Sequence, residues 1–401
     1  MRNAFIYSFL LVLFVAIPGG AAPSDEQIYH IPEYEQKLER VVLSLPAKED
    51  RLSYHEDILS RFPHYSEFIV LVAEDNVDSL KSSLKGKPYA DRVHLVPYPV
   101  KNISEARYFT MVAKKPTNVG VYRDRLWPQG TVWARDAFIS CKGADGEDWV
   151  MVPTYHRNIM QPLTDGGEGA TIQFDNDYLK ALRDLGVRMQ KNVPLVFDGG
   201  NVFFDTVDHE SVAFVGTDEF KASVALGEAI HSGMTKAALI ESFKDFFHVD
   251  KVVVFGTEKQ PQLMFHLDQA MALLPGKRAA VVRLSGPLPE DPIELKMVNE
   301  VSGFLQGIRA KLKEMGYSVL DLQVSSTSVL SRRFPNAVVF TDRESGKLNV
   351  LLSAYDDDSS FDQELREKNV SRLQSRGYVV DLIRTNANRN NGGVHCLYNS
   401  L

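Results

Sequence analysis

One structural unit recurs along this chain of 401 residues: two short apolar runs joined by a turn, then a helical pattern, then a third apolar run. Short apolar runs bounded by Gly, Pro, Asn or Asp are typical of strands, and apolar residues spaced three to four apart indicate helices. We therefore predict four copies of a hairpin–helix–strand unit. Their strands and helices are expected at 131–141, 149–155, 175–189 and 193–197; at 202–204, 211–215, 218–230, 236–247 and 252–255; at 262–274, 279–284, 295–315 and 318–322; and at 337–341, 349–353, 361–375 and 378–382.

Polar residues recur at corresponding places in these copies. Asp136, Asp198, His266 and Asn336 follow one another at intervals of 62, 68 and 70 residues. A regular period is typical of repeated structural units that stack or circle around an axis. The spacing therefore predicts blades around an axis, with one polar group in each.

The two ends of the chain supply the parts of a fifth unit, with strands and one helix expected at 41–45, 49–61, 68–73 and 394–398. We expect the C-terminal strand to pair with the strand at 41–45 and to close a ring of five α/β blades. A helix at 77–84 and a strand at 93–96 are additions to this scheme. Two side-by-side α/β domains are the alternative, and the lack of any linker-like segment argues against them.

The N-terminus has the pattern of a secretory signal peptide. Arg2 provides the positive start, residues 4–17 are apolar, and small residues follow at 18–22. The apolar run is short for a membrane span, although an uncleaved anchor is the alternative. We expect residues 1–22 to be removed, leaving one domain over 23–401 that is secreted or periplasmic and has no membrane contact.

The charge of the chain bears on its partners. The formal net charge is −7, and no run of Lys and Arg stands out. Nucleic acid is therefore not expected as a partner, because its binding depends on clustered positive charge. The sequence leaves the oligomeric state open.

A histidine and an aspartate lie two residues apart in the apolar segment 262–269. If this segment is a strand, His266 and Asp268 share one face, while Phe265 and Leu267 point to the other. A carboxylate beside a histidine favours acid/base chemistry, although a lone buried histidine is more often structural.

Three further motifs carry candidate groups. Asp198 ends an apolar run and is followed by two glycines and Asn201, which a simple turn would also explain. Asp136 ends the segment Trp133-Ala134-Arg135-Asp136, where an Arg–Asp ion pair is the alternative. Cys396 follows two glycines near the C-terminus in Gly392-Gly393-Val394-His395-Cys396. A thiolate is a strong nucleophile, and glycines let the backbone approach a ligand closely.

These four motifs, W-x-R-D, F-D-G-G-N, H-x-D and G-G-x-H-C in this order, resemble those of the guanidino-group-modifying enzymes of the pentein superfamily. That family includes arginine, agmatine and peptidyl-arginine deiminases, dimethylarginine hydrolases and amidinotransferases. The resemblance extends from about residue 131 to Cys396 and implies a five-bladed α/β propeller, in agreement with the repeat.

The resemblance also implies roles for the polar residues. Cys396 matches the nucleophile, His266 the general acid/base, and Asp198 the carboxylate that orients it. Asp136 and Asp268 match the pair that grips the guanidinium, a planar cation that carboxylates hold at two edges.

Two further residues are candidates for substrate contact. Arg135 lies beside Asp136, and Asn336 occupies the matching place in the fourth copy, where a turn asparagine after Pro335 is the alternative. The chain departs from the family at Asp198, where deiminases often have Glu, and at Asn201, where several members have Asp.

The second cysteine is Cys141. If Asp136 and Cys141 lie on one strand, they are roughly 16 Å apart at ~3.3 Å per residue. A disulfide needs Cα atoms within about 7 Å, so we expect Cys141 and Cys396 to be free thiols rather than a disulfide.

The resemblance implies a hydrolase that converts the guanidino group of arginine, or of an arginine-like or peptidyl-arginine group, into a ureido group through a covalent Cys396 amidino-thioether. An amidinotransferase using an amine acceptor and a non-catalytic guanidinium-binding protein are the alternatives. We expect no cofactor and no metal.

Overall fold

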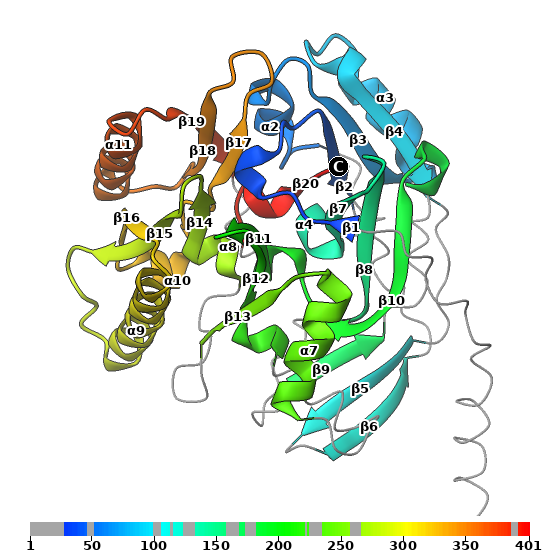
Figure 1. The fold of residues 1–401 in the computed structure, drawn as a ribbon. Coiled ribbons are helices and arrows are strands. Elements are labelled where there is room, and N and C mark those ends of the chain that lie inside the picture. Colours follow the sequence, from blue (N-terminus) through cyan, green and yellow to red (C-terminus); the bar gives the residue numbers. More distant parts are fainter. Residues whose placement is uncertain are drawn as a thin grey trace, which may run out of the picture.

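The computed structural model describes residues 28–45, 52–98, 106–112, 115–122, 133–157, 168–172, 182–220, 223, 235–256, 266–385 and 392–401. In these residues the chain has a mixed α/β fold built from several small sheets (Figure 1). The predicted signal peptide, residues 1–22, lies outside the described part. Among the described helices, none is long and apolar enough to cross a membrane.

Three sheets contain the predicted unit, in which an antiparallel hairpin is joined through a helix to a parallel third strand. The helices that precede the third strands are α7 (Lys236–Phe247), α9 (Pro292–Glu314) and α11 (Ser360–Gln374). The three sheets are β11 (Val202–Val207), β12 (Glu210–Gly216) and β13 (Lys251–Phe255); β14 (Met271–Leu274), β15 (Arg278–Ser285) and β16 (Ser318–Ser325); and β17 (Val338–Thr341), β18 (Leu348–Tyr355) and β19 (Val379–Thr385). The predicted units are confirmed in the described residues, except that the strand expected from residue 262 begins only at Met271. Most of the helix expected at 218–230 and residues 262–265 lie outside the described residues.

The first predicted copy lies within a seven-stranded sheet. Its hairpin is β7 (Ile139–Gly143) with β8 (Asp148–Arg157), and β10 (Arg188–Val196) pairs with β8 in parallel. The other strands are β1 (Ile28–Tyr29), β5 (Ala106–Val112), β6 (Lys115–Tyr122) and β9 (Glu168–Ile172). Of the helix expected at 175–189, residues 175–181 lie outside the described residues. The prediction of a helix over residues 182–189 is wrong, because the 3-10 turn η4 (Arg183–Leu185) is followed closely by β10.

The two ends of the chain meet in the fifth sheet, as predicted. Strand β20 (Tyr398–Ser400) pairs antiparallel with β2 (Arg40–Ser44), which pairs in parallel with β3 (Glu67–Ala73). Strand β4 (Val93–Tyr98) extends this sheet. The short elements around it are η1 (Glu33–Glu35), α2 (Glu56–Arg61), η2 (Glu74–Asn76), α3 (Val77–Leu84) and η3 (Ala90–Arg92).

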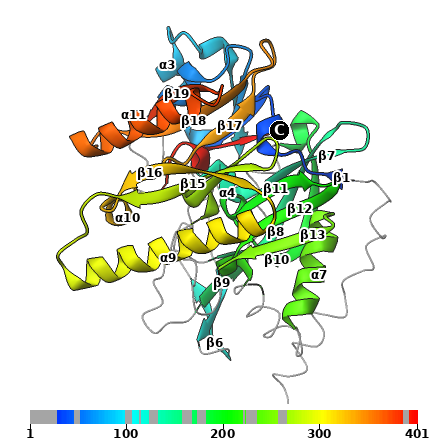
Figure 2. The same cartoon turned by 60° about the vertical axis from the view of Figure 1, so that its left-hand side comes forward.

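Helices α9 and α11 lie on the outer side of their sheets (Figures 1 and 2). The inner face of α9 is apolar, and each of its six buried residues has another three or four positions away: Val298, Val301, Phe304, Leu305, Ile308 and Leu312. This spacing places the side chains on one stripe against β15 and β16. Burial of such a stripe supplies most of the stability of a surface helix.

Short helical turns replace three of the predicted strand segments. Asp136 lies in α4 (Ala134–Ala137), Asp268 in α8 (Leu267–Ala270), and Cys396 in η7 (His395–Leu397). The predictions of continuous strands at 131–141, 262–274 and 394–398 are therefore wrong where these turns lie. Short apolar runs do not distinguish strand from buried helical turn, so the pattern alone was ambiguous.

Two further short turns are η5 (Gly199–Asn201) and α10 (Ser328–Ser331). The turns α4, η5, α8 and η7 each lead directly into the first strand of a hairpin or, for η7, into β20. The polar residues are thus carried by tight turns at the starts of strands, where several consecutive side chains can face one point.

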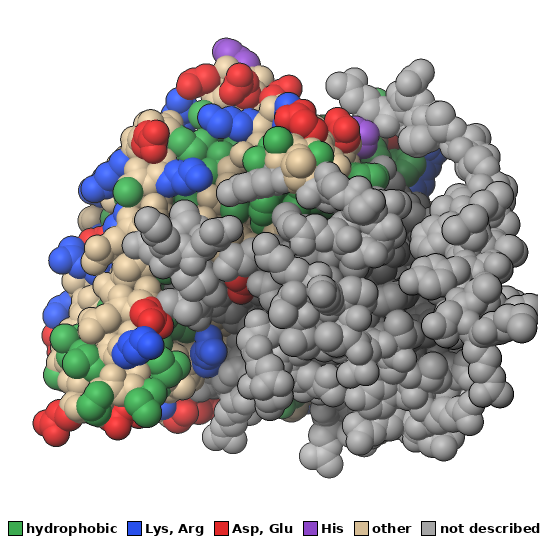
Figure 3. All heavy atoms as spheres, turned by 90° about the horizontal axis from the view of Figure 1, so that it is seen from below, with side chains coloured by type: hydrophobic (Ala, Val, Ile, Leu, Met, Phe, Trp, Pro, Cys, Tyr) green, Lys and Arg blue, Asp and Glu red, His purple; other side chains and the backbone are tan. Residues whose placement is uncertain are grey.

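Charged side chains of both signs are interspersed over the described part of the face in Figure 3.

Candidate active site

The predicted site residues from distant parts of the chain come together in the interior. Gly200 marks the point where they meet: a Cβ added there would lie 2.9 Å from Nδ1 of His266, 3.0 Å from Oδ1 of Asp136 and 3.0 Å from Oδ2 of Asp268. The absence of a side chain at Gly200 therefore leaves space among three candidate functional groups.

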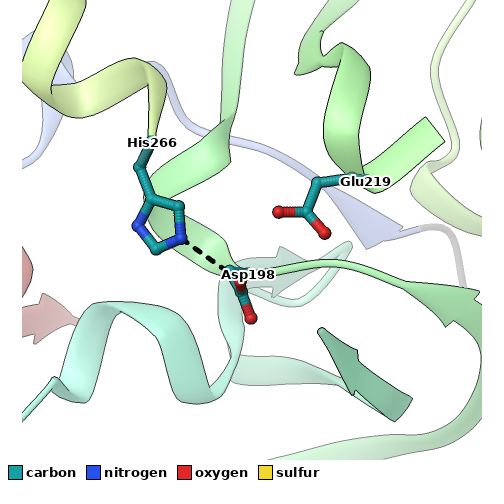
Figure 4. Close-up of side chains that lie close together, drawn as sticks. All are labelled: Asp198, Glu219 and His266. Atoms are coloured by element: carbon teal, nitrogen blue, oxygen red, sulfur yellow. Dashed lines mark hydrogen bonds and ion pairs between the residues drawn. The ribbon is translucent and has the colours of Figure 1, made fainter. Parts of the chain in front are cut away.

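His266 lies between two carboxylates. Its Nε2 is 3.2 Å from Oδ2 of Asp198, and its Nδ1 is 3.3 Å from Oδ1 of Asp136. Figure 4 shows the ring of His266 directed at Asp198. Because His266 and Asp198 are buried, the ring is held in one orientation, which is what an acid/base group needs.

Asn201 positions the segment that carries His266. Its side-chain oxygen accepts the backbone N–H of Leu267 at 3.0 Å, and its Nδ2 donates to Oε1 of Glu219 at 2.9 Å. Asn201, which the sequence marked only as a departure from the family, therefore connects η5 to the start of α8.

Cys396 is buried, and its Sγ donates to Oδ2 of Asp268 at 3.1 Å. Asn336 holds this turn in place, because its Oδ1 accepts the backbone N–H groups of His395 at 2.6 Å and Cys396 at 3.3 Å. Its Nδ2 lies 3.4 Å from Sγ. Asn336 is thus more than a turn residue: it orients the candidate nucleophile.

The charge states of these groups differ. Burial, together with the negative charges of Asp268 and Asp136, raises the pKa of the Cys396 thiol well above its ordinary value. Burial also raises the pKa of Asp136 to about 7, with His266 opposing the shift and the nearby Asp198 and Asp268 adding to it. The free site therefore holds a neutral thiol beside a carboxyl group that ionises near neutral pH.

Asp268 behaves in the opposite way. Burial alone would raise its pKa, but a hydrogen bond from His395 and the positive charges of His395 and His266 outweigh burial and lower the pKa. Its Oδ1 is buried and has no hydrogen-bond partner among the described residues. Asp268 thus offers a charged oxygen to a cation.

Two charged residues behind Asp268 had no predicted role. His395 contacts Oδ2 of Asp268 through Nδ1 at 3.0 Å and Oε1 of Glu33 through Nε2 at 2.9 Å. The guanidinium of Arg135 also pairs with Glu33, so the ion pair seen here is Arg135–Glu33 and not the Arg135–Asp136 pair considered from the sequence. The motif G-G-x-H-C displayed His395 next to the cysteine, whereas no sequence signal pointed to Glu33.

One group of side chains has the spacing of a metal site. Asp198, Glu219 and His266 each offer a ligand atom, and these atoms lie within 4.8 Å of one another (Figure 4). Two carboxylates and an imidazole suit a divalent ion such as Zn²⁺. However, Nε2 of His266 already bonds Asp198, and Glu219 already bonds Asn201, so the three act as hydrogen-bond partners in this structure.

Both cysteines are free, as predicted. Cys141 lies in β7 and is buried. The prediction was right although its geometry was wrong, since Asp136 belongs to α4 and does not share a strand with Cys141.

Together these groups comprise a candidate nucleophile, a candidate acid/base residue hydrogen-bonded to a carboxylate, and two carboxylates that could hold a cation. Such a set could attack the carbon of a cation that carries several N–H donors.

No protein-family model and no curated protein matches the sequence. Solved structures do match the fold. A proposed arginine deiminase from Porphyromonas gingivalis superposes with a TM-score of 0.58 at 16% identity, covering 94% of this chain and 98% of that chain. An agmatine deiminase from C. jejuni superposes with a TM-score of 0.52 at 15% identity, covering 95% of this chain and 98% of that chain. A variant of that enzyme with substrate bound matches equally well. These are pentein-superfamily enzymes, so the resemblance read from the four motifs is confirmed at the level of the fold.

Proposed function

We infer that this chain, which shares the fold of the pentein deiminases, is a guanidino-modifying hydrolase. The observation that carries the inference is the convergence of Cys396, His266, Asp136 and Asp268 around Gly200. A non-catalytic binder would need the carboxylates but not a thiol placed beside them. The substrate class is arginine, an arginine-like compound or a peptidyl arginine, and the small guanidino substrates of the matched deiminases favour the first two.

The carboxylates select the substrate. A guanidinium carries its charge over a plane with N–H donors on several edges, and it stays protonated at neutral pH. The carboxylates of Asp136 and Asp268 line the space at Gly200, through Oδ1 and Oδ2 respectively, and Oδ1 of Asp268 has no partner among the described residues. The two carboxylates can therefore hold two edges of the guanidinium, with its central carbon facing Cys396.

The first chemical step forms the S–C bond. When the cation binds, the thiol of Cys396 passes its proton to His266, and Sγ attacks the central carbon as the thiolate. The C–N bond then breaks, and His266 donates the proton to the nitrogen that leaves as ammonia or an amine. The arrival of the cation offsets the negative charge of Asp268 and Asp136 and so favours the thiolate. An amidino-thioether on Cys396 is left.

The second step removes the amidino group from sulfur. His266, now without its proton, takes one from water, and the resulting hydroxide attacks the carbon of the thioether. The S–C bond breaks as the C=O bond forms, the proton of the added hydroxyl passes to sulfur and restores the thiol, and a ureido product leaves. His266 then releases its proton to solvent. Asp198 stays hydrogen-bonded to Nε2 of His266 during both proton transfers, so Nδ1 is the nitrogen that exchanges the proton.

An amidinotransferase is the second candidate. Asp198 favours it, because deiminases often have Glu at this position. In that reaction an amine replaces water in the second step, and no ureido product forms.

Three further points belong to this proposal. The described residues form five sheets, and in four of them a short turn with polar residues precedes a strand; this arrangement suits a five-bladed propeller with the turns at its centre. The signal-like start of the sequence suits a secreted or periplasmic protein. We also infer that neither a metal nor a cofactor takes part, because the steps above use only the side chains present.

A screen of free arginine, agmatine, methylated arginines and an arginine-containing peptide tests the proposal. Ureido colour and ammonia release report hydrolysis, and the same screen with added glycine or another amine reports transfer. Hydrolysis is expected from the wild type and not from Cys396→Ala. Consumption of no guanidino compound, with or without an amine, would overturn the proposal.

A further inference from the structure

His395 is the most completely enclosed ionisable group behind the candidate nucleophile. Its side chain is 0% exposed. Each ring nitrogen faces a carboxylate oxygen, Asp268 at 3.0 Å and Glu33 at 2.9 Å. A neutral imidazole has one N–H and could donate to only one of them, whereas the protonated ring donates to both. The geometry therefore fits an imidazolium.

The surroundings of His395 fix the ring as well as its charge. The ring stacks on Phe203 with the centroids 5.9 Å apart and meets Tyr398 edge-on at 5.8 Å. Glu33 comes from η1, in the N-terminal segment, and is itself paired with Arg135. Burial would lower the pKa of His395, but the carboxylates of Glu33 and Asp268 outweigh burial and raise it, with Arg135 opposing them.

One oxygen atom links His395 to the nucleophile. Oδ2 of Asp268 accepts from Nδ1 of His395 and from Sγ of Cys396. Both contacts use the same oxygen and leave Oδ1 buried and without a partner among the described residues. His395 thus determines which oxygen of Asp268 serves the thiol and which one is left for a ligand.

We propose that His395 is a positioning residue: as an imidazolium held between Glu33 and Asp268, it keeps Asp268 ionised and reserves Oδ1 for the guanidinium of the substrate. This rests on the proposed function for the identity of the ligand. Glu33 then belongs to the functional site although it lies in the first described segment of the chain. The sequence motif that ends in Cys396 therefore carries a second functional residue.

The titratable and charged groups that face this pair come from several elements. Around His395 they are Glu33, Arg135, Asp268 and Tyr398. Around Asp268 they are His395, His266, Cys396, Asp136, Glu33, Tyr355 and Tyr398. Among them, His395 is the cation bonded directly to Asp268. Removal of its charge should therefore raise the pKa of Asp268 more than removal of any other of these groups.

The first test requires no turnover. In protein labelled with ¹⁵N-histidine, we expect both ring nitrogens of His395 to be protonated at pH 7, and the signal to be absent in His395→Gln and shifted in Asp268→Asn. A neutral single tautomer at pH 7 would overturn the proposal. The wild-type spectrum decides this point even if a variant fails to fold.

The second test follows pH dependence. Because Asp136 titrates near pH 7 and would set the acidic limb of the wild type, this test is made in an Asp136→Asn background. In that background, His395→Gln and Glu33→Gln should each move the acidic limb of kcat/KM, or of guanidinium binding if there is no turnover, to higher pH by about one to three pH units. A merely structural defect would lower the whole profile without moving the limb, and that result would overturn the proposal. His30→Gln is the matched control, because His30 contacts Phe204 and Phe247 and its loss should leave the limb in place.

A double variant tests whether His395 affects guanidinium binding through Asp268. If His395 acts through Asp268, His395→Gln should have little further effect in an Asp268→Asn background, whereas equal effects in both backgrounds would contradict the proposal. Failure of the proposed function and failure of the proposed role of His395 give different results. An imidazolium at His395 in a protein that turns over no guanidino compound refutes only the proposed function, and a neutral His395 in an active enzyme refutes only this inference.

Discussion

Oδ2 of Asp268 lies 3.1 Å from Sγ of Cys396, and this contact favours the protonated form of the candidate nucleophile. A carboxylate that accepts an S–H bond stabilises the thiol relative to the thiolate, and burial acts in the same direction. The pKa of Cys396 is accordingly raised well above its ordinary value. We therefore expect the unliganded protein to hold this candidate nucleophile as a neutral thiol until a cation binds.

Alkylation tests this charge state. Iodoacetamide should react slowly with Cys396 at neutral pH, and a small unreactive amidinium should speed the reaction because its charge favours the thiolate. Thiolate absorbance in the ultraviolet, with Cys396→Ala as the blank, separates this effect from crowding in the site. A full thiolate in the unliganded enzyme would contradict the prediction and indicate a preformed Cys396–His266 ion pair.

Removal of the nucleophile or of the acid/base residue should abolish turnover. Cys396→Ala and His266→Ala should each lose activity to the level of the double variant, because residues that act as one unit do not contribute additively. Cys141→Ala is the matched control: Cys141 is also a buried free thiol but lies in β7, so turnover should stay near the wild-type rate. Wild-type turnover in Cys396→Ala would refute the mechanism.

Guanidinium binding should strengthen as the pH rises through about 7. The pKa of Asp136 is raised to about 7, so the carboxyl is neutral below this pH and becomes an anion above it. In Asp136→Asn the affinity above pH 7 should fall by about 2–5 kcal/mol, and its pH dependence should flatten. Calorimetry with an unreactive guanidinium measures both.

The exposed Asp208, which pairs with Lys277, supplies the control for this experiment. Asp208→Asn should leave affinity and pH dependence unchanged. Binding to Asp136→Asn that matches the wild type at every pH would show that the cation is held elsewhere.

The paired glycines at 199 and 200 should respond differently to the same substitution. A Cβ at Gly199 would lie 2.0 Å from the backbone oxygen of Arg135, so Gly199→Ala should destabilise the fold severely. The three atoms nearest to a Cβ at Gly200 belong to the side chains of His266, Asp136 and Asp268, so Gly200→Ala should fold but bind guanidinium poorly. Thermal unfolding and calorimetry distinguish the two, and normal binding by a folded Gly200→Ala would show that the space is not the substrate site.

Asn336 should matter for catalysis through two separate properties. Its backbone has a φ of 38°, which glycine tolerates and alanine does not, and its side chain bonds the N–H groups of His395 and Cys396. Loss of such a buried hydrogen-bond acceptor costs about 1–3 kcal/mol. Asn336→Gly should therefore lower kcat about 10- to 100-fold, and Asn336→Ala should add a loss of stability. Equal kcat in Asn336→Gly and the wild type would remove Asn336 from the site.

Local pattern and order along the chain were enough to predict the hairpin–helix–strand units, the long helices α9 and α11, and the pairing of the two chain ends through β2 and β20. These features depend on hydrophobic period and turn residues, which are properties of neighbouring positions. The four short motifs were also sufficient to choose Cys396, His266, Asp198, Asp136 and Asp268.

Only the tertiary structure decided how these groups are presented. The turns α4, α8 and η7 form where strands were expected. Buried polar side chains need hydrogen-bond partners, and the local backbone takes the conformation that lets these side chains reach them. The partners that set the charge of the site lie far apart in sequence: Arg135 and Glu33 are 102 positions apart, and His395 and Glu33 are 362. An ion pair across such distances leaves no local period in the sequence, so Glu33 and the role of His395 emerge only when the chain is folded.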